Sequence, residues 1–260
     1  MKGKNLNDLW SAYRYGDKIK VVYHITGKRC DNPFKKSKLQ QHYEELELIP
    51  IPDPEGDAQR FEQSLSRTRS TIFEIAMCNE FTHFCTFTAD AEKCDRFDLK
   101  AFHKEFSQFI RDENKKRSES EKLRYLLIPE QHKDGAWHFH ALFMGLGKKD
   151  LKKNEFGYLD WFAYRRRFGF FSCSKIKSHE ACSKYITKYV TKSIASDVKR
   201  NAGQHLFYAS QGLRRREVLD VLSGDKCPFM TGEKSEKWDF ENEYVKIKWV
   251  NINPENGIVF

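Results

Sequence analysis

Two histidines and a carboxylate form the pattern in this chain that is best suited to chemistry. They lie in the segment Glu130–His140, which reads Glu-Gln-His-Lys-Asp-Gly-Ala-Trp-His-Phe-His and continues into four apolar residues. Because side chains alternate along a strand, His138 and His140 share one face and Phe139 lies on the other. The Lys-Asp-Gly before them is a turn signal, and a hairpin closed by this turn brings Glu130 opposite the histidines.

Two imidazoles and a carboxylate are a ligand set for a divalent metal that leaves positions open for a substrate. One alternative is a pair of partly buried histidines with no ligand, which is the commoner outcome for an isolated His-x-His. Another is a non-haem iron oxygenase, because that class of enzyme uses the same three ligands. The segment by itself leaves these alternatives open, so the elements around it must be considered.

The surrounding sequence predicts strands that alternate with helices. A helix begins near Ser66, and an amphipathic helix is expected at residues 98–111. The segment Ile49–Gly56 holds three prolines and a glycine, which exclude a helix or a central strand there. The order predicts an α+β fold of ferredoxin-like kind, with an antiparallel central sheet and helices packed mainly on one face. Strands are expected at residues 81–88, 123–129, 138–144 and 168–174.

The composition indicates a soluble globular protein with a polyanionic partner. A chain of 260 residues with 39% hydrophobic residues can bury a full core. There is no apolar run of the roughly 18 residues that a membrane span needs. No signal peptide is recognisable, so we expect a cytoplasmic protein without a membrane partner. The formal net charge of +9 favours nucleic acid as the partner.

The seven cysteines form no Cys-x-x-Cys pair, which argues against a zinc ribbon or a redox motif. Free thiols in a reducing compartment are therefore expected. A zinc site assembled from Cys78, Cys85 and Cys94 is the less favoured alternative.

A second constellation lies on a helix predicted from Ser178 to Ile194, for which Ser178 is the candidate N-cap. A separate aliphatic stripe supplies the face that packs on the sheet, so the polar arc of this helix is free for another role. With about 100° per residue, two tyrosines and two lysines occupy that one arc. They are Tyr185, Lys188, Tyr189 and Lys192.

A tyrosine beside a metal site and two lysines has a specific use. Its phenol has an unperturbed pKa of about 10 and becomes a nucleophile when a nearby cation lowers that pKa. A divalent ion at Glu130, His138 and His140 can polarise a phosphodiester for attack, and Lys188 can stabilise the developing negative charge. The products are a 5′-phosphotyrosine and a free 3′-hydroxyl, and the reverse step rejoins the strand.

Residues 146–171 interleave basic and aromatic side chains, as proteins that bind single-stranded nucleic acid do. The alternative is that these aromatic residues belong to the core, and we expect about half of them in each role. The DNA-binding candidates from this segment and its neighbours are Arg165, Arg166, Arg167, Lys175 and Lys184.

Three motifs in order resemble those of HUH-type rolling-circle replication initiators. The chain is most similar to the Rep proteins of phages and small plasmids that carry a Tyr-x-x-x-Tyr motif, the filamentous-phage gene II class. The resemblance covers residues 66 to about 216. Phe84–Thr88 resembles the first motif, Glu130 with His138 and His140 resembles the metal motif, and Tyr185–Lys192 resembles the catalytic helix.

The resemblance implies a split βαβ nuclease fold, with the first-motif strand beside the histidine strand and Mg²⁺ or Mn²⁺ as the metal. Tyr185 would be the first nucleophile and Tyr189 a second one. It implies an endonuclease (nickase) that initiates DNA replication by cutting and rejoining single-stranded or hairpin origin DNA. A host helicase and polymerase are the expected partners, because the chain has no Gly-x-x-x-x-Gly-Lys-Ser/Thr loop for ATP-driven unwinding.

We therefore expect three regions. Residues 1–65 are an N-terminal extension without a motif, residues 66–220 are the HUH endonuclease domain, and residues 221–260 are a tail that adds a strand. A plasmid relaxase or an HUH transposase with the same chemistry remains an alternative. So does a single-stranded DNA-binding module that has lost catalysis.

Overall fold

The computed structural model divides the chain into two compact units, which are described separately. The first unit combines Met1–Leu65 with Arg216–Phe260, and the second is Ser66–Arg215. Both constellations singled out by the sequence lie in the second unit. The structure describes residues 10–24, 54–195, 205–219, 237–242, 245–253 and 257–259.

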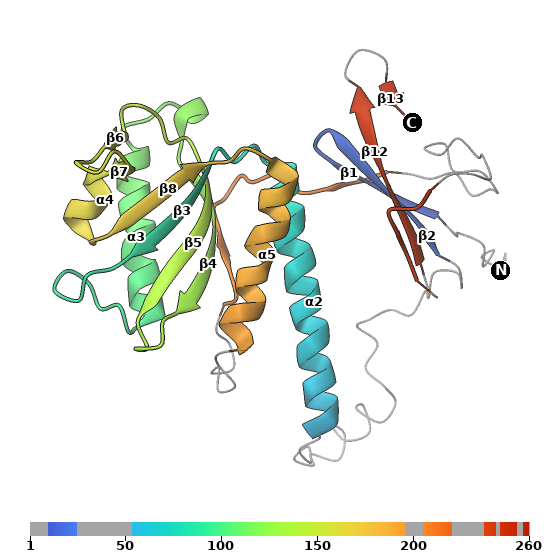
Figure 1. The fold of residues 1–260 in the computed structure, drawn as a ribbon, viewed down its shortest axis with the longest axis horizontal. Helices are drawn as coiled ribbons and strands as arrows, with labels where there is room; N and C mark the ends of the chain where they lie inside the picture. The colour runs from blue at the N-terminus through green and yellow to red at the C-terminus, as the bar shows by residue number, and fades with distance from the viewer. Residues whose placement is uncertain are drawn as a thin grey trace. The chain divides into compact units, whose positions relative to one another are not determined.

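The second unit is built on a five-stranded antiparallel sheet (Figure 1). Each of the four expected strands is present, with bounds shifted by up to three residues. The predicted α+β class with an antiparallel sheet is therefore confirmed. The strands lie in the order β8 (Phe171–Lys175), β3 (His83–Thr88), β5 (Trp137–Met144), β4 (Arg124–Gln131) and β9 (Tyr208–Ala209).

One face of this sheet packs on helices α3 (Leu99–Asn114) and α4 (Phe162–Arg167) through a largely aromatic core. Phe102 of α3 stacks on Phe139 of β5, with ring centroids 4.5 Å apart. Asp98 caps α3, because its carboxylate accepts hydrogen bonds from two backbone N–H groups of the first turn. α3 also connects β3 to β4, which run parallel to each other on either side of β5.

The opposite face is covered by helix α5 (His179–Ala195), so the expectation that helices pack mainly on one face is wrong. α5 packs against β4 and β5, and its Ile186 is fully buried. Figure 1 shows α3 and α5 on opposite sides of the sheet. The physical reason is that β4 buries Leu126 and Ile128 on one face as well as Leu127 on the other, so both faces need a covering layer.

The β4–β5 hairpin sets the register of the two motif strands. Glu130 pairs directly with His138, as the predicted turn requires. The turn closes through the N–H of Gly135, which donates to the carbonyl of His132 at 2.9 Å. Gly135 has a φ of 87°, a left-handed conformation that glycine adopts without steric cost, so the Asp-Gly signal has a direct structural cause.

Helix α2 (Pro54–Cys78) leads into the second unit. The prediction that Ile49–Gly56 excludes a helix is wrong for Pro54–Gly56, which form the first turn of α2. A proline is tolerated there because the N–H group that it lacks would have no partner within the helix. Residues 49–53 lie outside the described part of the chain. The remaining short elements are the 3₁₀ turn η1 (Glu119–Glu121) and the separate hairpin of β6 (Leu151–Lys153) and β7 (Leu159–Trp161).

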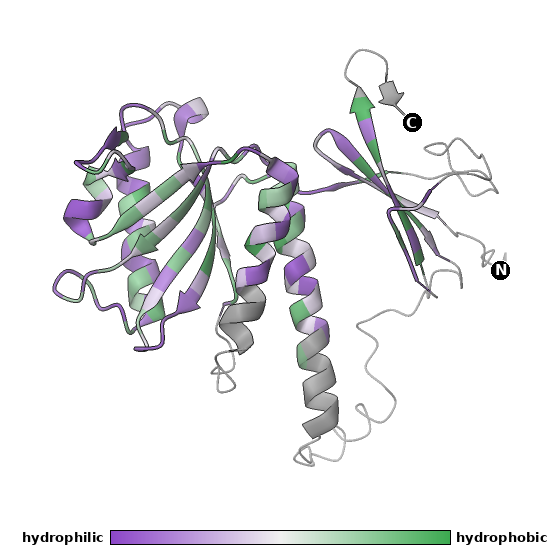
Figure 2. Cartoon of the chain, in the orientation of Figure 1, coloured by the Kyte–Doolittle hydropathy of each residue, from purple (hydrophilic) through white to green (hydrophobic). Residues whose placement is uncertain are grey.

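Hydrophobic and hydrophilic positions alternate along the strands in Figure 2, as expected for strands that face two different layers. None of the helices that the structure describes has the length and apolar character that a membrane span requires.

The first unit is a six-stranded antiparallel sheet with a small core of Ala12, Ile19, Val21 and Val250. The strand at residues 245–253 lies in the tail, for which the sequence predicts an added strand. Another strand, at residues 217–219, falls before the predicted boundary at residue 220. The strands are β10 (Glu217–Leu219), β1 (Trp10–Tyr15), β2 (Lys18–His24), β12 (Val245–Asn253), β11 (Phe240–Glu241) and β13 (Gly257–Val259).

Candidate active site

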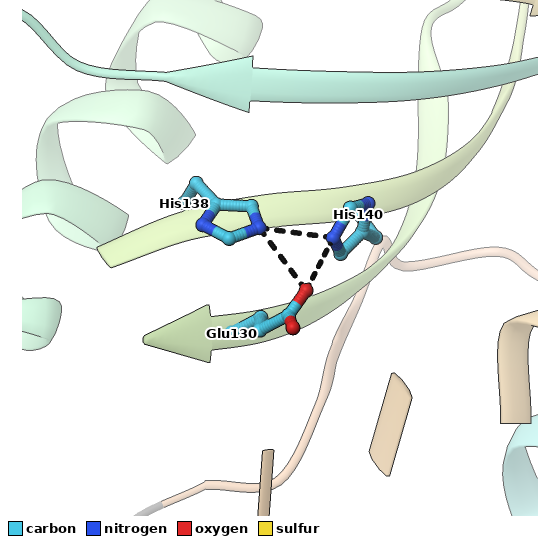
Figure 3. A group of neighbouring side chains, drawn as sticks. All are labelled: Glu130, His138 and His140. Carbon is cyan, nitrogen blue, oxygen red and sulfur yellow. Dashed lines mark hydrogen bonds and ion pairs between the residues drawn. The ribbon is translucent and has the colours of Figure 1, made fainter. Parts of the chain in front are cut away.

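Glu130, His138 and His140 bring three ligand atoms together on the face of the sheet that α5 covers (Figure 3). Glu130 Oε2 lies 2.6 Å from His140 Nε2 and 3.2 Å from His138 Nε2. The two imidazole nitrogens are 2.9 Å apart, and all three side chains are buried. Convergence of one carboxylate and two imidazoles within 4.8 Å fits a single divalent ion.

The thiols do not form a competing site in the part of the chain that the structure describes. Its one group of three or more clustered ligand side chains is Glu130, His138 and His140. The alternative zinc site is therefore wrong, because its three cysteines lie on α2, on β3 and in the segment between β3 and α3. Among the residues that the structure describes, the cysteines outside any disulfide are Cys78, Cys85, Cys94, Cys173 and Cys182.

The protonation state of His138 suits a metal ligand. Burial lowers the pKa of His138 to about 4, assisted by positive charge on His140 and His132 and opposed by Glu130. His138 is therefore neutral at pH 7, and its Nε2 can offer a lone pair. Thr86 Oγ1 lies 3.3 Å from Nδ1 of His140, so that hydroxyl can accept the ring N–H and leave Nε2 as the ligand atom.

Strand β3 lies beside the histidine strand, in the position that the resemblance implies for the first motif. Thr86 pairs with His140 and Thr88 with His138, so both hydroxyl groups share a face with the ligands. Phe84 follows on the same face, with its ring centroid 6.0 Å from that of His140. The first-motif strand therefore forms the sheet surface next to the three candidate metal ligands.

Local interactions set the start and the rotation of α5. Ser178 caps the helix, since its Oγ accepts the N–H of Ala181 at 3.3 Å. Ser183 and Ile186 are both fully buried, so this face of the helix points at the sheet. The two tyrosines lie on a different side of the helix, next to this buried face.

Tyr189 contacts the ligand cluster, and Tyr185 lies beside Tyr189. The ring of Tyr189 stacks on His140 with centroids 3.8 Å apart, and its hydroxyl lies 2.7 Å from that of Tyr185. Burial, the hydrogen bond to Tyr185 and the negative charge of Glu130 raise the pKa of Tyr189. Tyr185 is 47% exposed and rests near Phe84, with ring centroids 5.6 Å apart. Tyr185 is thus the more exposed of the two tyrosines.

The predicted lysines have different surroundings. Lys188 is exposed on α5, and the side chain of Lys192 lies outside the described residues. Lys184 pairs with Glu180 one turn earlier, at 2.7 Å. Lys175 is exposed at the end of β8. The structure therefore places Lys184 and Lys188 on the tyrosine helix and Lys175 on a neighbouring strand.

The structure does not bring the three predicted arginines to the ligand cluster, because α4 lies on the other face of the sheet. Arg165 pairs with Asp160 at 2.6 Å, and Arg167 pairs with Glu105 at 2.9 Å. Arg166 is exposed. The aromatic residues of this segment divide between buried and exposed positions, and their role in DNA binding stays a prediction. Trp161, Tyr164, Phe168 and Phe171 are buried, whereas Tyr158, Phe162 and Phe170 are exposed.

Two aromatic residues beside the site were missed by sequence reasoning. His132 has its ring centroid 4.0 Å from that of His138, but it lies in a turn, where no periodicity indicates which side chains meet. Phe84 was recognisable only as a member of the first motif. Its alternation with Thr86 was the available signal, because it places both on one face.

A comparison with protein families matches residues 82–194 to the family of the replication-associated protein ORF2 and gene II protein. The matched segment begins just before β3 and ends within α5, so it contains the ligand cluster and both tyrosines. Searches of curated proteins and of solved structures found no match. The family match supports a Rep-type, replication-associated protein, for which DNA is the expected partner.

Proposed function

We propose that this protein is an HUH-type rolling-circle replication initiator that nicks and rejoins single-stranded origin DNA by transesterification. The observation that carries the proposal is a pair of tyrosine hydroxyl groups beside a buried cluster of two histidines and one carboxylate. An iron oxygenase would have no role for the tyrosine pair. A module that only binds DNA would have no need for the buried ligand cluster.

The ferredoxin-like nuclease fold is supported by the connectivity of the second unit. β3, α3, β4, β5, α4 and β8 follow one another as a β-α-β-β-α-β unit, interrupted by the β6–β7 hairpin. β5 lies between the parallel strands β3 and β4, which is the arrangement of a split βαβ motif. We assign the nuclease chemistry to this unit, within the expected domain of residues 66–220.

Glu130, His138 and His140 would hold the divalent ion, for which Mg²⁺ or Mn²⁺ suits phosphodiester chemistry. When bound, the ion would polarise the phosphodiester. Tyr185 Oη attacks the phosphorus, and the bond from phosphorus to the 3′ oxygen breaks. The phenol proton is lost to solvent and the leaving 3′ oxygen takes one up, which gives a 5′-phosphotyrosine and a free 3′-hydroxyl.

The neighbouring residues of α5 complete the proposed cycle. Lys188 stabilises the negative charge that develops on the phosphate. Tyr189, with its hydroxyl 2.7 Å from that of Tyr185, is placed to act on a second phosphodiester so that cleavage and rejoining alternate. Unwinding and synthesis would come from a host helicase and polymerase in the cytoplasm.

The test is the formation of a covalent protein–DNA adduct. The protein is incubated with Mn²⁺ and a labelled random-sequence pool of single-stranded DNA, and adducts are resolved on a denaturing gel. Wild type should form an adduct and Tyr185→Phe should not. The matched control is Tyr158→Phe, because this tyrosine is 73% exposed and lies away from the cluster.

Two outcomes would change the proposal. Absence of an adduct with wild type would sink the nuclease claim. An adduct that survives Tyr185→Phe but not Tyr189→Phe would move the nucleophile to Tyr189. A relaxase or transposase would also form the adduct, and the sequence recovered from the adducts would separate these from a replication initiator.

A further inference from the structure

A cavity of about 740 Å³ lies in the second unit, at the end of the five-stranded sheet where β3 begins and β8 ends. Its walls come from the loop after β5, from the β6–β7 hairpin and from the segment between β8 and α5. Aliphatic side chains of Leu146, Leu151 and Leu159 line it. The volume lies within the range of roughly 300–1,000 Å³ that is typical of small-ligand sites.

The rim of this cavity is cationic. Lys148, Lys175 and Lys177 line it, and all three are exposed. The carboxylate among the lining residues belongs to Glu80, whose side chain is 93% exposed and lies 3.9 Å from Arg214. An apolar floor with a cationic rim suits a nucleotide, because the base can be buried while the lysines contact phosphates.

The cavity also carries hydrogen-bonding groups suited to a base edge. His83 is buried in its wall, and burial together with the positive charge of Lys175 lowers the pKa of this histidine. His179, at the start of α5, is a second imidazole in the lining. Nδ1 of His83 lies 2.9 Å from the hydroxyl of Thr82, so Nε2 is the ring nitrogen of His83 that is left for a base edge.

One wall is held in place by a buried arginine. Arg117 donates to the carbonyl of Gly145 at 3.3 Å and to Oδ2 of Asp150 at 3.2 Å. Oδ2 of Asp150 also accepts the N–H of Gly147 at 3.0 Å. The loop that carries Gly147 and Lys148 is therefore fixed before a ligand arrives, which lowers the entropic cost of binding.

Two elements connect this cavity to the tyrosine site. β3 begins at His83 in the cavity and reaches Thr86, which pairs with His140, about 10 Å further along at strand spacing. α5 begins at His179 in the cavity and reaches Tyr185 after a rise of about 9 Å. His83 pairs with Phe143 on the α3 face of the sheet, so a DNA strand that joins the two sites passes the end of the sheet. At a stacked spacing of about 3.4 Å, the rise along these elements corresponds to at least about three nucleotides.

We propose that this cavity, which we call the base pocket, receives one unpaired base of the DNA strand a few nucleotides from the phosphodiester at Tyr185. Its lysines contact the flanking phosphates. The base pocket thereby sets which phosphodiester of the strand meets the tyrosines. This inference rests on the proposed function for the identity of the ligand, and on the cavity itself for the site.

The test uses the glycine at the rim. A Cβ added at Gly147 would meet no atom within 4 Å, so Gly147→Trp can narrow the base pocket and Gly147→Ala is the matched control. Metal-free binding is measured by fluorescence anisotropy with a single-stranded oligonucleotide recovered from the adducts, or from selection for binding. A single abasic site is moved along this oligonucleotide, one position at a time.

We expect one abasic position to weaken binding to wild type and to Gly147→Ala by roughly tenfold, as for the loss of one stacked base. Gly147→Trp should bind the intact oligonucleotide about as weakly as wild type binds the oligonucleotide with the abasic site at that position. Placing the abasic site there should not weaken the binding of Gly147→Trp any further. A flat abasic profile in wild type, or an unchanged profile in Gly147→Trp, would overturn the base pocket. Tighter binding of a free deoxynucleoside monophosphate than of the strand would also overturn it.

A double variant of two rim lysines, with a single lysine variant as its control, tests the base pocket if Gly147→Trp does not fold. Lys148→Ala with Lys177→Ala should lower the slope of log affinity against log salt by about 1.4, since each single-strand phosphate contact contributes about 0.7. Lys116→Ala, at a side chain 75% exposed and outside the base pocket, should leave the slope unchanged. An unchanged slope in the double variant would remove the lysines from the proposal.

Because these measurements need no metal and no cleavage, failure of the base pocket and failure of the nuclease chemistry are distinguishable. A position-dependent abasic profile without any adduct would leave the base pocket in place and remove the tyrosine chemistry. Adduct formation with a flat profile would do the reverse.

Discussion

On β5, Phe139 faces α3, whereas His138 and His140 on either side of it face α5. The α3 face is filled by aromatic rings such as Phe87 and Phe143 that are completely buried. The α5 face carries the ligand cluster and the tyrosines, and Tyr185 there is 47% exposed. The same strands thus carry a close-packed aromatic layer on one face and the candidate reactive face on the other.

Under the proposed function, alternation along the strands separates the residues that stabilise the sheet from the residues that carry out the chemistry. The aromatic core between β5 and α3 fixes the backbone of β5. The backbone in turn fixes the positions of the His138 and His140 side chains. Substitutions on the α3 face should therefore change stability first, and substitutions on the α5 face should change activity first.

The largest expected effect is on the reactive face. Glu130→Gln keeps the shape of the side chain but removes the charge that a divalent ion requires. Adduct formation should fall by more than about 10³-fold, the scale seen when one member of a catalytic unit is lost. Densitometry of the adduct band over time measures it. Binding of single-stranded DNA, followed by anisotropy, should be retained, because it is chiefly electrostatic. Equal loss of binding and cleavage would show that Glu130 has a structural role.

The next effect is on the packed face. Phe139→Ala removes a fully buried ring between the two histidines and should lower the free energy of unfolding by about 3–5 kcal/mol. Urea denaturation of the protein measures this loss. Phe84→Ala on the α5 face is the control, with an expected loss of about 1 kcal/mol because that ring is only half-buried. Similar losses from the two variants would contradict the division between the faces.

Metal binding should stabilise the reactive face directly. At a Mn²⁺ concentration of about 100 times Kd, binding to the folded state contributes about 2.7 kcal/mol. This should raise the melting temperature by several degrees for a domain of this size. Differential scanning fluorimetry with Mn²⁺ and with chelator compares the two states. If His138→Ala shows the same rise, the ion binds elsewhere in the protein.

The smallest effect concerns a histidine on the packed side. Burial lowers the pKa of His103 on α3 to about 4, with added effects from the positive charges of His205 and Arg111. The unfolded chain takes up this proton near pH 6.5, before the folded chain does, so stability should fall as the pH drops from above 6.5 towards 4. Melting temperatures at about pH 7 and about pH 5 should differ less for His103→Gln than for wild type. Identical declines would assign the pH dependence to other groups.

The local parts of the candidate site could be predicted because short-range chemistry specifies them. The Asp-Gly turn and the alternation along β5 place Glu130 opposite His138. Ser178 as a helix cap fixes where α5 starts, and helical periodicity puts Tyr185 and Tyr189 on one arc. Each of these inferences spans only a short stretch of neighbouring residues, so no distant contact was needed to make it.

The non-local parts could not be predicted in the same way. The arginines of α4 met the composition expected for DNA contacts, yet α4 packs on the face opposite the ligand cluster. Periodicity tells which residues share a face but not which layer that face meets. The base pocket likewise joins Leu146, Lys175 and His179, which only the assembled sheet brings together.

By itself, the amino-acid sequence determined the three candidate ligands, their hairpin and the tyrosine helix, since turn chemistry, strand alternation and capping act between near neighbours. The tertiary structure decided that this helix lies over the histidine face, with Tyr189 stacked on His140, and that the arginines lie on the other side. Which helix covers which face depends on how the helices of the whole unit pack against the two apolar faces of the sheet. Burial of both faces is a property of the whole unit, and no short stretch of sequence encodes it.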